Sequence, residues 1–180
     1  MLQTDECPLH AKAEKIPLLK PVFKENGTIT AASSSSISDG AAALVLMRAS
    51  EAMKRKLTPI AKILAHASFS QDPAWFSTAV IGAIQILLKK LQWTTEDIDL
   101  FEINEAFAVV PLAAMQDLKL SPEKVNVHGG ACALGHPIGA SGARIICTLL
   151  GALKQQKKKT GIAALCIGGG EATAIAIELY

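Results

Sequence analysis

The stretch GGACALGHPIGASGAR, residues 129–144, is too rich in glycine for the interior of a helix or strand and too apolar for a linker. Its single histidine, His136, lies between a glycine and a proline. Proline biases the residue before it towards an extended backbone and is well suited to the first turn of a helix. The stretch therefore predicts an imidazole held at the point where a loop becomes a helix.

Apolar patterns on both sides of this stretch predict alternating strands and helices. Short apolar runs predict strands at residues 43–47, 59–67, 98–103, 125–127, 161–167 and 172–179. Apolar residues at helical spacing predict helices at residues 51–56, 78–91, 105–118 and 138–155. This alternation predicts an α/β fold with a mostly parallel sheet and helices on both faces. The turn Gly168–Gly170 predicts that the last two strands are antiparallel.

Composition narrows the class of protein. The chain has 180 residues, enough for one core, and its formal net charge of +2 gives no indication of a nucleic-acid partner. The polar, acidic start indicates no signal peptide, so we expect a cytoplasmic location. The four cysteines show no Cys-x-x-Cys spacing, so we expect no metal site. The apolar run from Pro73 to Leu88 is short for a membrane span, and we expect no membrane partner.

Three residues at the predicted junctions are candidates for chemistry. Asn104 follows one strand, His136 precedes a long helix, and Cys166 ends the penultimate strand. Singly, each has a structural explanation: a helix cap, a structural histidine and an inert buried thiol. Together they provide a base and an oxyanion site, provided that dipoles or a cation lower the pKa of the thiol. This combination favours enolate or acyl-transfer chemistry.

Several motifs resemble the thiolase family and occur in the order of that family. They are NEAFA at residues 104–108, GHP within residues 129–144 and CIGGG at residues 166–170, with further similarity at residues 28–31 and 39–43. The resemblance covers essentially the whole chain and is greatest to the biosynthetic branch, the acetyl-CoA acetyltransferases. It implies the C-terminal half of a two-half, layered α/β fold, with a mixed five-stranded sheet and helices on both faces.

The resemblance also implies a division of the chain. Residues 1–36 correspond to the tail of the family's loop region, and residues 37–58 to the last strand and helix of the N-terminal half. Residues 59–180 correspond to the C-terminal thiolase domain. The Ser33–Ser36 run alone is consistent either with a flexible linker or with a binding loop. The resemblance places Ser35 near the pantetheine of coenzyme A, although the family usually has asparagine and glycine around this serine.

The family pattern implies a role for each remaining site residue. Cys166 is similar to the cysteine that acts as acid and base, removing the α-proton of the second acyl-CoA. His136 is similar to the histidine whose ring N–H holds the thioester oxygen, and Asn104 to the residue that positions a water in the same oxyanion hole. Gly168 matches the glycine whose backbone N–H contributes to a second hole. The implied substrates are acyl-CoA thioesters, with no cofactor and no metal.

One departure from the family pattern leaves three functions open. The nucleophilic cysteine of thiolases lies in the first half, and no cysteine here has its sequence context. The first possibility is a thiolase-type acyltransferase of fatty acid metabolism that condenses two acetyl-CoA molecules to acetoacetyl-CoA and CoA, with this chain inactive alone. The second is a non-catalytic fragment or subunit, and the third is a CoA-binding module. The expected partner is a chain carrying the N-terminal half, or a second copy in a full-length homo-oligomer.

The missing half also predicts a physical property. The apolar strand expected at residues 43–47 has no obvious sheet to join within this chain, and an apolar strand on a bare edge promotes association. We therefore expect poor solubility for the chain without a partner.

Overall fold

The structure is a computed structural model that describes residues 3–180. Its α-helices are α1 (Glu6–His10), α2 (Ala49–Lys54), α3 (Ala79–Leu91), α4 (Val109–Leu118), α5 (Ala131–Leu134) and α6 (Ser141–Gln156). Its strands are β1 (Ala61–Ser70), β2 (Leu100–Ile103), β3 (Thr160–Cys166) and β4 (Glu171–Leu179). Short 3₁₀ helices occupy Ala13–Leu18, Ala31–Ser33, Pro73–Thr78, Thr95–Asp97 and Pro122–Lys124.

The four strands form one mixed sheet in the order β1-β4-β3-β2. The prediction of antiparallel final strands is confirmed, because β3 and β4 pair through the tight glycine turn. Only β2 and β3 pair in parallel, so the prediction of a mostly parallel sheet was wrong. The reason is that β4 returns between β3 and β1 and is antiparallel to both.

Two predicted strands are not strands in the structure. Residues 125–127 contribute a single bridge, between Val125 and Phe101, so the sheet has four strands rather than five. Residues 43–47 pair with no strand among the described residues. A strand exists only through hydrogen bonds to a neighbour, and this segment has none to pair with. Its side chains stay exposed, Val45 by 87% and Leu46 by 65%.

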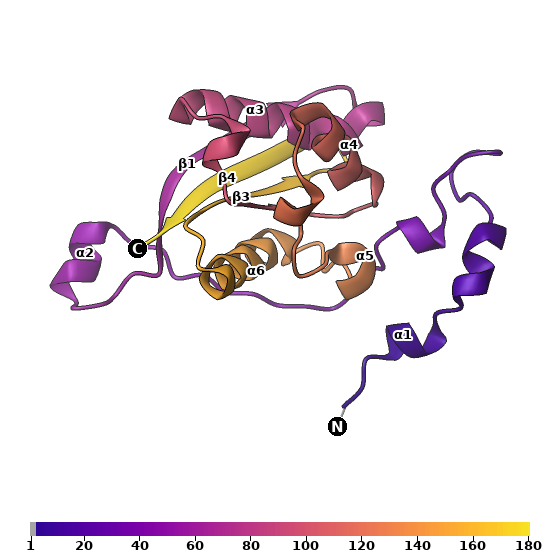
Figure 1. Cartoon of the computed structure of the whole chain (residues 1–180), viewed down its shortest axis with the longest axis horizontal. Helices are drawn as coiled ribbons and strands as arrows, with labels where there is room; N and C mark the ends of the chain where they lie inside the picture. Colours follow the sequence, from indigo (N-terminus) through magenta and orange to yellow (C-terminus); the bar gives the residue numbers. More distant parts are fainter. Residues whose placement is uncertain (1–2) are drawn as a thin grey trace.

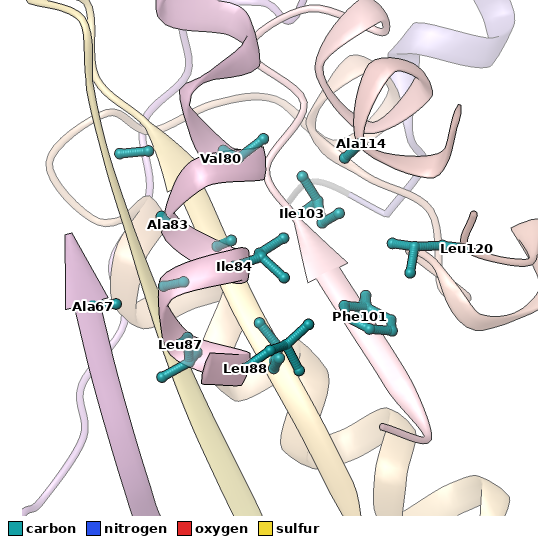
Figure 2. Close-up of a cluster of buried hydrophobic side chains, with 14 of the residues drawn as sticks. Ala67, Val80, Ala83, Ile84, Leu87, Leu88, Phe101, Ile103, Ala114 and Leu120 are labelled. Carbon is teal, nitrogen blue, oxygen red and sulfur yellow. The ribbon is translucent and has the colours of Figure 1, made fainter. Parts of the chain in front are cut away.

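The larger core lies between α3, α4 and one face of the sheet (Figure 2). Val80, Ile84 and Leu87 recur at helical spacing along α3 and are fully buried. Phe101 and Ile103 of β2 belong to the same core and lie beside α3 in Figure 2. Burial of each such large apolar side chain contributes about 1.5–3 kcal/mol, so this face fixes α3 on the sheet.

Helix α6 covers the opposite face of the sheet (Figure 1). Ile145, Leu149 and Leu153, spaced four residues apart, are buried against Leu100 and Ile177. The prediction of helices on both faces is confirmed. The first turn of α6, which follows His136, is thereby held rigidly at the end of the sheet that carries the candidate site.

The segment Pro73–Leu91 is long and apolar enough to cross a membrane by length and composition alone. In the structure it is interrupted where a 3₁₀ helix joins α3, and the α3 part buries one face in the core. Its apolar character is explained by that packing.

Gly170 is the position in the β3–β4 turn that requires glycine. Its φ is +100°, and an added Cβ would press against the Gln71 carbonyl oxygen and the backbone of Asp72 and Pro73. We expect Gly170→Ala to lower the free energy of unfolding by about 1–3 kcal/mol, measured by urea denaturation. Gly151→Ala is the control, because Gly151 lies in α6 with open space around its Cα. That change should stabilise the chain by about 0.5–1 kcal/mol. Equal stability of Gly170→Ala and the wild type would contradict the turn geometry.

Candidate active site

The parallel pairing of β2 and β3 brings the two strand ends to the same edge of the sheet. Ile103 and Ala164 are partners in the register, so Asn104 directly follows β2 close to the end of β3, where Cys166 lies. Asn104 is fixed further by its backbone N–H, which donates to the Ala164 carbonyl oxygen at 2.9 Å. Two residues 62 positions apart in the sequence thus meet through strand pairing.

A second set of contacts positions His136 at this edge of the sheet. The Glu105 carboxylate accepts hydrogen bonds from Asn126 Nδ2 at 2.9 Å and from the Cys132 backbone N–H at 3.0 Å. It therefore pins the loop that leads to the histidine. An added Cβ at Gly130 would collide with this carboxylate, which explains the glycine there. The His136 backbone N–H donates to the Ser36 carbonyl oxygen at 2.9 Å.

An open cavity of about 450 Å³ lies where these elements meet. It is lined by four of the five predicted site residues, Ser35, His136, Cys166 and Gly168. The fifth, Asn104, is 1% exposed and lies behind the histidine, with its Nδ2 atom 3.2 Å from His136 Nε2. The structure thus brings all five residues to one place.

The cavity wall is mostly apolar. Phe76 and Phe107 line it, with their ring centroids 6.1 Å apart in an edge-to-face arrangement. Phe23, from the segment before the serine run, packs edge-on against Phe107 at 5.4 Å. The Ser35 hydroxyl donates to the Ala106 carbonyl oxygen at 2.9 Å, so the serine run is attached to the fold at this point.

A buried polar chain stands behind His136. Its Nδ1 atom lies 2.6 Å from Ser141 Oγ, and Ser141 is fully buried. Arg144 Nη2 donates to Asn104 Oδ1 at 3.5 Å, and Arg144 Nη1 donates to Glu102 Oε1 at 3.2 Å. Glu102 is only 2% exposed. These groups hold the Asn104 amide and the imidazole in place.

Burial dominates the electrostatics of the site. It raises the pKa of Glu102 to about 7, although the charge of Arg144 acts in the opposite direction. Burial, together with the charge of Arg144, lowers the pKa of His136, so the imidazole is neutral at pH 7. Burial also raises the pKa of Cys166. The lowered thiol pKa on which the sequence-based hypothesis depended is therefore not found, and Cys166 rests as a thiol able to donate a proton.

Sequence reasoning missed the residues that support the site. Ser141 and Arg144 were within the glycine-histidine stretch. Ser141 contacts His136 and Pro137 of the same stretch, whereas Glu102 and Asn104, the partners of Arg144, are distant in the sequence. The one available signal for Glu102 was a carboxylate inside an otherwise apolar strand, which requires a buried partner. Among residues 3–180 no group of three or more His, Cys, Asp or Glu side chains is arranged to hold a metal ion.

Family models match most of the chain. The model described as "Thiolase, C-terminal domain" matches residues 57–179, and the model described as "Thiolase, N-terminal domain" matches residues 1–50.

Individual acetyl-CoA acetyltransferases are also similar to this chain. The acetyl-CoA acetyltransferase of Schizosaccharomyces pombe is 46% identical over 178 residues, covering 99% of this chain and 45% of the relative. The cytosolic acetyl-CoA acetyltransferase of Mus musculus is 47% identical, covering 98% of this chain and 45% of the relative. The chain thus spans less than half the length of these relatives.

Solved structures are similar over the same region. The acetyl-CoA acetyltransferase of Bacillus anthracis superposes with a TM-score of 0.91 at 44% identity, covering 94% of this chain and 43% of that one. The Acat5 thiolase of Ascaris suum, solved in complex with coenzyme A, gives a TM-score of 0.89 at 43% identity. It covers 99% of this chain and 47% of that one.

Proposed function

The chain belongs to the thiolase family, and from that premise we propose that it supplies the second half of an acetyl-CoA acetyltransferase active site. The reaction would be the condensation of two acetyl-CoA molecules to acetoacetyl-CoA and CoA, and the reverse thiolysis. The observation that carries the proposal is the single cavity shared by His136, Cys166 and Gly168, with Asn104 bonded to the histidine. The division of the chain after residues 36 and 58 stays a prediction.

Each side chain has a chemical task in this proposal. Cys166 exchanges a proton with the α-carbon of the attacking acetyl group or with the CoA thiol, acting as general acid and base. His136 and Asn104 stabilise the oxygen of that thioester as it becomes an enolate. Gly168 lines the same cavity, and its backbone N–H would stabilise the second oxyanion. Ser35 would lie beside the pantetheine arm.

The names of the relatives support the substrate class. Several are acetyl-CoA acetyltransferases, and one solved relative contains coenzyme A. We therefore propose coenzyme A thioesters as substrates, without a further cofactor. A cytoplasmic location is proposed by analogy with the mouse relative, which is named cytosolic.

Exposed apolar surface supports a partner that carries the first half. Val45, Leu46 and Ile37 are exposed on the segment before α2, and Ile138 and Leu134 are exposed beside the site. An apolar surface of this kind is typical of an interaction face. We propose that it packs against the first thiolase half, which would supply the acyl-accepting cysteine. We also propose that the resulting pairs of halves assemble into a homo-oligomer.

Reconstitution tests the proposal. The chain alone should show negligible thiolysis of acetoacetyl-CoA, because the acyl group has no nucleophile to accept it. Co-expression with the first half of a close relative should yield a soluble complex and restore CoA-dependent loss of acetoacetyl-CoA absorbance. The control is the same first half carrying alanine in place of its nucleophilic cysteine. A soluble, assembled complex with no thiolysis would contradict the enzyme proposal.

A second candidate, a non-catalytic subunit, is favoured by one observation. No cysteine in this sequence has the context of the thiolase nucleophile. This candidate predicts a soluble complex with a full-length thiolase and no rescue of activity by a first half. Binding of CoA without such rescue would instead favour the CoA-binding module.

A further inference from the structure

The side chain of Asn126 bonds the end of β2. Its backbone is in the left-handed region, with a φ of +48°, which asparagine tolerates better than most residues. Its Oδ1 atom accepts from the Ile103 backbone N–H at 2.7 Å, and its Nδ2 atom donates to the Ile103 carbonyl oxygen at 2.8 Å. The side-chain amide thus bonds the last residue of β2 at both backbone groups, as a neighbouring strand would.

The same amide also holds the residue that follows Asn104. Its Nδ2 atom donates to Glu105 Oε1 at 2.9 Å. A primary amide has two N–H groups, so one serves Ile103 and the other Glu105. The opposite orientation would place the amide oxygen against a carbonyl oxygen and a carboxylate. The contacts therefore determine the orientation of the Asn126 amide, and they hold Asn104 through both of its neighbours in the sequence.

The second carboxylate oxygen of Glu105 holds the loop that carries the histidine. Its Oε2 atom accepts from the Cys132 backbone N–H at 3.0 Å. That N–H lies in the first turn of α5, where the helix itself offers no carbonyl to accept it. Helix α5 is a single turn, and His136 follows it after one glycine. Glu105 therefore connects the end of β2 to the short helix that leads into His136.

We propose that Asn126 and Glu105 are positioning residues for the two side chains of the oxyanion hole. Together they fix Asn104 relative to His136. Four hydrogen bonds of 2.7–3.0 Å link β2, through these two side chains, to α5. The direct contact, between Asn104 Nδ2 and His136 Nε2, is longer at 3.2 Å. Neither Asn126 nor Glu105 is among the residues that line the cavity, so both act through other residues.

The consequence for catalysis rests on the proposed function. Asn104 and His136 are there assigned to one thioester oxygen, and such stabilisation depends on the distances from the donors to the oxygen as it becomes charged. A misplacement of about 1 Å can lower a rate by about 10²-fold. Loss of the contacts made by Glu105 should therefore lower kcat without removing any group that touches the substrate.

The test is Glu105→Ala in the chain reconstituted with a first half. This change removes both hydrogen bonds of the carboxylate, so kcat for thiolysis should fall by about 10²-fold, whereas KM for CoA should change little. Glu105→Gln should give an intermediate kcat, because its amide oxygen can replace only one of the two carboxylate oxygens as acceptor. Glu123→Ala is the matched control. Glu123 is exposed in the turn before Asn126, so kcat should stay within about twofold of the wild type.

A double-mutant cycle separates positioning from general destabilisation. In the Asn104→Ala background no amide remains to be aligned with His136. Glu105→Ala should therefore lower kcat by less than about tenfold in that background. A purely structural role for Glu105 would give the same loss in both backgrounds.

Hydrogen exchange provides a readout that requires no turnover. The exchange of the Cys132 amide is followed by NMR of the ¹⁵N-labelled full chain, alone or with an unlabelled first half. This amide should be protected in the wild type and should exchange at least about tenfold faster in Glu105→Ala, because it loses a hydrogen bond to a charged group. Glu123→Ala should leave its exchange unchanged.

Three outcomes would overturn the proposal. An unprotected Cys132 amide in the wild type is decisive even where Glu105→Ala fails to fold. The others are a folded Glu105→Ala complex with the wild-type kcat, and an equal loss of kcat in the Asn104→Ala background. Absence of thiolysis in the wild-type complex would instead contradict the proposed function, so the two failures are distinguishable.

Discussion

Cys166→Ala is expected to lower kcat for thiolysis by about 10³-fold in the chain reconstituted with a first half, as removal of a general acid–base group does. Cys166 ends β3 and is 7% exposed. It is the one cysteine among the residues that line the cavity. Its raised pKa keeps it protonated at rest, so it is suited to return a proton to a carbanion. KM for CoA should change little, because the loss falls on proton transfer rather than on binding.

Cys147→Ala is the matched control for that experiment. Cys147 is exposed on α6 and does not line the cavity, so this change should leave kcat within about twofold of the wild type, as surface changes usually do. A kcat for Cys166→Ala within tenfold of the wild type would remove Cys166 from the proton-transfer role. The dissociation constant for CoA, measured in parallel, would show whether the cavity is intact.

Arg144→Met is expected to lower the free energy of unfolding by about 3–5 kcal/mol at pH 8, the range for breaking one partner of a buried pair. Glu102 is 2% exposed and has Arg144 as its ionic partner. Without the guanidinium, Glu102 at pH 8 must either carry a buried charge with no compensating cation or take up a proton, and both lower the stability of the folded chain. Urea denaturation followed by tryptophan fluorescence measures the loss.

The loss of stability in Arg144→Met should depend on pH, and the pKa of Glu102 sets the direction of that dependence. The pKa of Glu102 is about 7 in the folded chain, above its ordinary value of 4.5. Its contribution to stability is therefore fully present below pH 4.5 and is lost as the pH rises through 7. Removing Arg144 raises the folded pKa further, because Arg144 favours the charged form. The deficit of Arg144→Met should therefore be smaller at pH 5, where Glu102 is protonated in both chains, than at pH 8.

Arg55→Met is the control for the buried pair. Arg55 and Glu51 also form an arginine–glutamate pair at the end of α2, but their side chains are 64% and 40% exposed. Such a surface pair contributes about 0–1 kcal/mol, so its loss should be small and should show little pH dependence. A loss as large as that of Arg144→Met would indicate that burial is not the cause.

The elements of the fold were predictable where local pattern determines structure. The apolar residues at helical spacing in residues 78–91 predicted the helix that the structure shows as α3, with Val80, Ile84 and Leu87 on its buried face. Helix α4 begins at Val109 rather than near Glu105. The reason is that Asn104 and Glu105 are committed to contacts with the histidine and the glycine loop.

Strand pairing was less predictable, because it depends on residues far away in the chain. Residues 43–47 have the composition of a buried strand and yet form none, since no described strand lies beside them. Residues 125–127 have similar composition and make one bridge. The composition of a segment indicates its propensity to form a strand, whereas a β-ladder also requires a neighbouring strand to pair with.

The sequence by itself determined which residues are brought to the site. The motifs around Asn104, His136 and Cys166, and the glycine turn after Cys166, indicated both the family and the cavity lining. Only the tertiary structure decided the state of those residues. Burial, which no local pattern records, raises the pKa of Cys166 and of Glu102. The chain of polar contacts from Glu102 through Arg144, Asn104 and His136 to Ser141 joins groups from a strand, a loop and a helix. Their donors and acceptors meet only after folding, so the chemistry of the Gly129–Arg144 stretch follows from its neighbours in space.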